Sequence, residues 1–186
     1  FGTYMKYLLF LFLSLLCASD DNAPANRTKD RQVDIKHIKI NVSVDLKAKS
    51  VFGHVTHTLS PLRSNLSSFI LHGDDMKIRR IRMGGKDLNY THSGNEIHID
   101  LPNPISWDET VDVRIDYIAN PREGTYFFGP DDTYPKQPWQ AWTQGETEDN
   151  HHWVPLYDYP NERATFETIL TVCLLYTSDA ADELRS

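Results

Sequence analysis

The chain has 186 residues, of which 40% are hydrophobic and 24% are charged. These proportions are typical of a globular domain, and they exclude a disordered or fibrous chain. The formal net charge of −7 favours neither nucleic acid nor an anionic membrane as a partner.

The first residues have the architecture of a signal peptide. A lysine precedes an apolar run at residues 8–16, and the small residues Cys17-Ala18-Ser19 follow it. The apolar run is shorter than the roughly 20 residues that span a bilayer, so no stable membrane anchor is expected. We therefore predict that residues 1–19 are upstream residues plus a signal peptide cleaved near Ser19, and that the protein is secreted or periplasmic.

The other end of the chain resembles translated sequencing adapter. Cys173 to Glu183 can be back-translated into the end sequence of a transposon, so residues 173–186 are predicted to be a non-native tail. Residues 20–32 are polar and small, as in a linker, which leaves residues 33–172 as the predicted domain. Both cysteines of the chain lie outside this domain, so neither a disulfide nor a thiolate metal site is expected in it.

Apolar and polar residues alternate along several short segments, which is the period of a half-buried strand. The first two segments are close together in sequence, so a hairpin is expected. Pro102 and Pro104 are expected to end the strand that precedes them. No segment has a convincing helical period. The sequence predicts an all-β fold, an antiparallel β-sandwich, with strands near residues 38–46, 51–59, 68–72, 77–83, 88–91, 97–101, 111–117 and 165–172.

Residues 122–167 differ from the rest because aromatic residues and prolines crowd a segment with little strand periodicity. Gly124-Thr125-Tyr126-Phe127-Phe128 is followed by Trp142-Thr143-Gln144-Gly145-Glu146, and then by Val154-Pro155-Leu156-Tyr157-Asp158-Tyr159-Pro160-Asn161. In order and spacing these segments resemble motifs of the aminopeptidase N family of zinc metallopeptidases, the gluzincin aminopeptidases that include leukotriene hydrolase. The counterparts are a Gly-aromatic-Phe turn, a Thr-Gln-x-Glu stretch and a Phe-Pro-Cys-Phe-Asp-x-Pro-like segment.

The resemblance implies that residues 33–172 are the N-terminal, saddle-like β-domain of a secreted aminopeptidase that acts on peptide substrates. In the family this domain packs on a thermolysin-like catalytic domain and closes one side of its active-site cleft. The family's zinc ion is held by a His-Glu-x-x-His helix and a later glutamate, and it activates a water. That motif does not occur in this sequence. The zinc is therefore expected only in the full-length enzyme, and this chain alone is expected to bind none and to be inactive.

Glu146 is the predicted site residue, and Gln144 is a weaker candidate beside it. An aminopeptidase must hold the free α-ammonium of its substrate, and a carboxylate can do so through a charge-assisted hydrogen bond. By its position in Gln144-Gly145-Glu146, Glu146 matches the family residue of this domain that helps to bind the substrate amino terminus. The alternatives are a solvated loop acid for Glu146 and a backbone-capping residue for Gln144.

The histidines are not predicted to bind metal. His54 and His57 point to opposite faces if their segment is a strand, and they are expected to be surface or edge residues. His151 and His152 fail likewise as an adjacent pair if the local chain is extended. Asp158 is expected to anchor the turn before the last strand by accepting hydrogen bonds from backbone amides.

The aromatic residues of the same region suggest an alternative function. Clustered rings can form a stacking platform for sugars, although they are more often core or domain interface. The alternative is therefore a non-catalytic β-sandwich that binds carbohydrate or mediates adhesion. The rings concerned are Trp139, Trp142, Trp153, Tyr157 and Tyr159.

Overall fold

A computed structural model describes residues 30–172. The predictions of a signal peptide at residues 1–19 and of a non-native tail at residues 173–186 lie outside the described residues. Between them the chain is all-β, as predicted, and none of the helical structure in residues 30–172 is long and apolar enough to cross a membrane.

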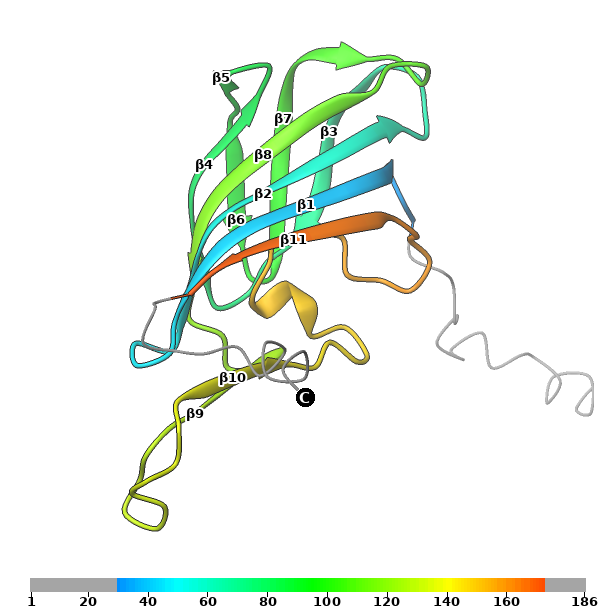
Figure 1. Ribbon diagram of the computed structural model, residues 1–186. Coiled ribbons are helices and arrows are strands. Elements are labelled where there is room, and N and C mark those ends of the chain that lie inside the picture. Colours follow the sequence, from blue (N-terminus) through cyan, green and yellow to red (C-terminus); the bar gives the residue numbers. More distant parts are fainter. Residues whose placement is uncertain (1–29, 173–186) are drawn as a thin grey trace, which may run out of the picture.

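Two sheets face each other in the main body of the molecule (Figure 1). The larger sheet has six strands in the order β11-β1-β2-β8-β4-β5, and the smaller has three in the order β3-β7-β6. The strands are β1 (Val33–Asp45), β2 (Ser50–Pro61), β3 (Leu66–His72), β4 (Met76–Met83), β5 (Lys86–Asp87), β6 (Tyr90–Ser93), β7 (Glu96–Ile105), β8 (Val111–Ala119) and β11 (Thr165–Thr171).

The core lies between these two sheets. Leu59 and Ile115 of the larger sheet are fully buried, as are Phe69, Ile97 and Ile99 of the smaller one. The period-two pattern of the sequence produces this arrangement, because alternate residues of each strand point to the same face. When the two sheets pack together, the apolar side chains on their facing surfaces are removed from water.

β1 and β2 form the predicted hairpin. The Asp45 carboxylate accepts hydrogen bonds from the amides of Lys47 (3.0 Å) and Ala48 (2.9 Å), which holds the turn between the strands. A bulge between Ile35 and His37 shifts the register, so buried positions are odd-numbered before it and even-numbered after it.

The prediction that Pro102 and Pro104 end their strand is wrong, because β7 continues to Ile105. β6 pairs with β7 only as far as Ile99. Beyond that point one side of β7 has no ladder partner within its sheet, and a proline there removes no ladder hydrogen bond.

The last strand departs from the predicted antiparallel arrangement. β11 runs parallel to β1, whereas the other strand pairs within residues 30–172 are antiparallel. It forms an edge of the six-stranded sheet, and the side chain of Phe166 on it is 73% exposed. A parallel edge strand requires a long crossover, and residues 120–164 provide it.

Candidate functional site

The crossover contains a hairpin that the sequence pattern did not predict. β9 (Thr125–Phe128) pairs with β10 (Gln140–Thr143), and the hairpin projects away from the two sheets (Figure 1). Both strands have only four residues, which is too short for a period-two pattern to stand out.

The loop that follows β10 carries the predicted site residues and is constrained by two backbone hydrogen bonds. The amide of Gln144 donates to Gly124 O (3.0 Å), and the amide of Asp149 donates to Gly145 O (3.3 Å). Gly124 has a φ of +73°, and a Cβ on it would lie 2.0 Å from Asp149 O. Only glycine permits both this backbone conformation and this approach.

Glu146 lies on this tethered loop and is exposed, as is Gln144. Among the described residues, the Glu146 carboxylate has no ion-pair partner within 4.0 Å. The backbone of Gln144 is used in the loop tether. The geometry therefore presents a carboxylate to solvent on a constrained loop.

An apolar groove of about 560 Å³ lies beside the loop. The loop connects Thr143 to Asn150, and both of these residues line the groove. The apolar lining comes from β1, β2, β10, β11 and the segment after the loop, and includes Ile38, Ile40, Val42, Val44, Val51, Trp142, Trp153, Val154, Leu156, Phe166 and Leu170. Glu146 thus belongs to a loop at the rim of an apolar hollow.

A short 3₁₀ helix, η1 (Asn150–His152), follows the loop and brings two histidines against carboxylates. Asp158 accepts from the backbone amide of His151 at 2.9 Å, and its Oδ2 lies 2.9 Å from His151 Nδ1. The hydrogen bond with Asp158 raises the pKa of His151, although partial burial opposes the shift. The Asp158 carboxylate therefore stabilises the imidazolium form of His151.

His152 makes a similar pair with a residue far away in sequence. Its Nδ1 lies 2.9 Å from Oδ2 of Asp75, which belongs to the turn between β3 and β4. The amide of Arg122 donates to the same oxygen (3.0 Å), and its Nε donates to Oδ1 (2.6 Å). Partial burial raises the pKa of Asp75, but the hydrogen bonds from Arg122 and His152 outweigh it and lower that pKa overall.

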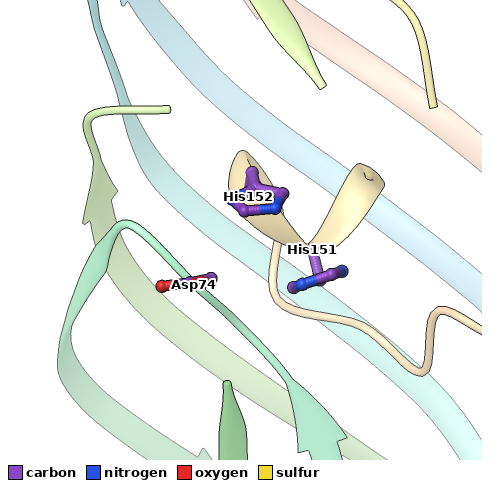
Figure 2. A group of neighbouring side chains, drawn as sticks. All are labelled: Asp74, His151 and His152. Carbon is purple, nitrogen blue, oxygen red and sulfur yellow. The ribbon is translucent and has the colours of Figure 1, made fainter. Parts of the chain in front are cut away.

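Two groups of side chains in residues 30–172 have a spacing that could hold a metal ion: Asp74 with His151 and His152, and Glu123 with Asp149 and His152. In the first group one ligand atom from each residue lies within 4.8 Å of the other two. Figure 2 shows its three side chains. The ring centroids of the two histidines are 4.6 Å apart, because they lie on η1 and not on an extended chain. The reason given above for excluding this pair as ligands is therefore wrong. Their Nδ1 atoms nevertheless already face the carboxylates of Asp158 and Asp75, so both histidines are held in ion pairs, and the pair of His152 with Asp75 joins η1 to the turn before β4.

The prediction for His57 is also wrong, because it is neither a surface nor an edge residue. It lies on β2, in the interior of the six-stranded sheet, and its side chain is fully buried. Its Nε2 donates to Pro155 O at 2.8 Å. Burial lowers the pKa of His57 to about 4. His54 is part-exposed on the opposite face of the same strand, as the strand geometry predicts.

Asp158 accepts a hydrogen bond from a backbone amide, as predicted, but not in the turn where it was expected to do so. It accepts the His151 amide upstream and not an amide of the turn before β11. That turn is held instead by Glu162, whose carboxylate accepts from the amides of Ile35 (3.1 Å) and Arg163 (2.8 Å). Glu162 is the anchor that the sequence analysis missed.

The five aromatic residues proposed as a sugar platform are divided between different environments. Trp142 stacks on Tyr126 in the β9–β10 hairpin, with ring centroids 4.7 Å apart. Tyr157 and Tyr159 pack around the ring of His72. This division does not favour a single flat binding surface.

Comparison with known proteins relates this architecture to one family. Residues 34–178 match the family model described as the peptidase M1 N-terminal domain. The chain belongs to this family. The match covers most of the chain, so the predicted resemblance to the zinc aminopeptidases is confirmed.

The relatives of this M1 N-terminal domain are much longer than the chain. Leukotriene A-4 hydrolase of Xenopus laevis is 24% identical over 156 residues, which are 80% of this chain and 26% of that protein. The M1 zinc metallopeptidase of Deinococcus radiodurans shares the fold with a TM-score of 0.65 and 21% identity, over 78% of this chain and 33% of that one. Leukotriene A4 hydrolase of Saccharomyces cerevisiae has a TM-score of 0.67 and 13% identity, over 81% and 26% of the two chains.

Proposed function

We propose that this chain is the N-terminal substrate-binding and gating domain of a secreted zinc metalloaminopeptidase that removes N-terminal residues from peptides. Support comes from its membership of the peptidase M1 N-terminal domain family and from a match that covers 26% of the leukotriene hydrolase. The zinc and the catalytic groups belong to a downstream catalytic domain. This chain alone binds no zinc stoichiometrically and hydrolyses no aminoacyl anilide.

The proposal rests above all on the environment of Glu146. Its carboxylate is exposed, has no cation beside it among the described residues, and stands on a loop tethered to Gly124 through Gln144 and closed by the bond from Asp149 to Gly145. A substrate α-ammonium supplies the missing positive charge. Once the catalytic domain covers the groove and excludes water, this pair strengthens because the local dielectric falls. Gln144 positions the same end of the substrate.

The groove beside the loop supports an interdomain role. A lining that includes Phe166, Leu170 and Trp142 exposes apolar side chains that a stable domain normally covers. The downstream catalytic domain is the partner we assign to this surface. Covering it places the Glu146 loop at the junction of the two domains, where the cleft would open.

The test is Glu146→Gln in the full-length enzyme. Glutamine keeps the size of the side chain and an acceptor but removes the negative charge. The loss of a charge-assisted bond of roughly 1.5–3 kcal/mol corresponds to a fall in kcat/KM of about 10- to 150-fold for free-amine substrates. Glu148→Gln is the matched control, because Glu148 is an exposed acid of the same loop. We expect that control to leave kcat/KM unchanged.

An N-acetylated peptide adds a second readout, because it has no ammonium group to bind. Any residual cleavage of it should be nearly indifferent to Glu146→Gln. Unchanged kcat/KM for free-amine substrates would return Glu146 to the class of solvated loop acids. An equal loss in the Glu148→Gln variant would show that general loop charge, and not a specific contact, is responsible.

A further inference from the structure

The outer face of the six-stranded sheet carries a cluster of arginines that the net charge of the chain conceals. Arg79, Arg80 and Arg82 of β4 and Arg114 of β8 line a hollow of about 360 Å³, in which the only acidic side chain is Asp116. The chain as a whole has a formal charge of −7, yet four guanidinium groups here surround one carboxylate. The cluster therefore has a local excess of positive charge.

A β-bulge creates this cluster. Ile78 and Ile81 are both buried although they are three residues apart, because the register between β4 and β8 shifts between Ile78 and Arg80. In a regular strand Arg79 and Arg80 would point to opposite faces. The bulge places both on the exposed side, at the cost of one ladder position. β-Bulges commonly redirect side chains near binding sites.

Asp116 does not exhaust the donors of the arginines. It binds Arg82 Nη2 (3.1 Å) and Arg114 Nη2 (3.0 Å), and Arg80 Nε is 3.9 Å away. The Nε of Arg82 is buried and has no hydrogen-bond partner. A buried guanidinium donor without an acceptor is costly, and it shows that Asp116 leaves part of the hydrogen-bonding capacity of these arginines unused.

The positive field of the cluster also acts on His54. It lies opposite Asp116 on the neighbouring strand β2. Burial lowers the pKa of His54, and the charges of Arg114 and Arg82 lower it further, although Asp116 acts in the other direction. The arginines therefore outweigh their single acidic partner at this position.

We propose that this arginine hollow between β4 and β8 binds a tetrahedral oxyanion, a phosphate or sulfate group. The planar fork of a guanidinium matches two oxygens of such a group, and a tetrahedral anion has enough oxygens for several forks at once. Asp116 holds Arg82 and Arg114 in position, while Arg79 and Arg80 remain available. The site is independent of the proposed aminopeptidase function, because it uses none of its residues.

The test is a titration of the 186-residue chain with inorganic sulfate and then with inorganic phosphate, at ionic strength kept constant with sodium chloride. NMR of the arginine Nε–H groups is the readout, and we expect a saturable shift of Arg82. Arg79→Gln with Arg80→Gln should weaken binding by about tenfold or more, since two charged donors are lost. Lysine at both positions keeps the charge and should retain more of the affinity. Arg63→Gln is the control, because Arg63 is an exposed arginine outside the hollow that pairs with Asp30.

Three results would overturn the proposal: no saturable shift, equal affinity in the double glutamine variant, or an equal loss in Arg63→Gln. Near-ultraviolet circular dichroism checks that each variant is folded. If the double glutamine variant does not fold, the double lysine variant still tests the proposal. Two further probes distinguish the source of the group. A sulfated disaccharide represents a glycan, and phosphatidylcholine vesicles containing phosphatidic acid represent a lipid headgroup. Saturation by the inorganic anions alone assigns the site to a free anion.

Discussion

His57 should make the stability of this domain fall between neutral and mildly acidic pH. The ring is fully buried, its Nε2 donates to Pro155 O at 2.8 Å, and its Nδ1 has no hydrogen-bond partner. Protonation would place a charge at an unpartnered buried atom, so the pKa falls from 6.5 to about 4 in the folded protein. Between these values the unfolded chain binds a proton that the folded chain does not, so stability decreases as the pH falls.

The magnitude follows from the size of the shift. A difference of one pKa unit corresponds to about 1.4 kcal/mol, so the full transition costs about 3 kcal/mol, of which about 2 kcal/mol appears by pH 5. His57→Gln removes the titration and keeps an amide that can donate to Pro155 O. Urea unfolding of both proteins from pH 7.5 to pH 5 measures the difference in slope.

The comparison between wild type and variant isolates His57, because other titrating groups contribute equally to both. The wild type should lose about 2 kcal/mol more than the variant over this range. If both lose the same free energy of unfolding, then His57 is protonated in the folded state or is not buried as described, and the reasoning fails. A variant that is less stable at pH 7.5 but flatter in its pH dependence still satisfies the expectation.

Three further expectations concern the site region. Asp158→Asn should destabilise the domain by roughly 1.5–3 kcal/mol at pH 6 and by less at pH 9. Because the pKa of His151 is raised in the folded protein, the stabilisation from its pair with Asp158 is complete below pH 6.5 and is lost as the pH rises through the folded-state pKa. If urea unfolding shows that the variant loses the same free energy of unfolding at both pH values, this expectation is contradicted. Gly124→Ala should cost more in thermal unfolding than Gly94→Ala, because both glycines have positive φ but only Gly124 has an atom within 4 Å of the added Cβ; strain of this kind is worth about 1–3 kcal/mol. Metal analysis of the purified chain should find less than one zinc per molecule, and one tightly held zinc would overturn the ion-pair interpretation of His152, which belongs to both candidate ligand groups.

The sequence by itself determined the fold class and most of the strands. Alternation across Ile38–Leu46 and Val111–Tyr117 is a local property, since it depends only on which face each side chain takes, and the structure confirms both strands. The family was readable for a similar reason. The segments around Gly124 and Glu146 are short and contiguous, so their order and spacing can be recognised in the sequence without knowledge of the fold.

Only the tertiary structure decided which distant residues meet. Asp75 and His152 are 77 positions apart, and their pairing depends on how the crossover folds back to the turn before β4. His57 resembles an ordinary strand histidine in sequence, but its burial depends on the position of β2 within the sheet. The bulge at Arg79 likewise follows from the register with β8, because two buried isoleucines must face the same core. Such contacts are set by packing between elements, which local sequence patterns do not encode.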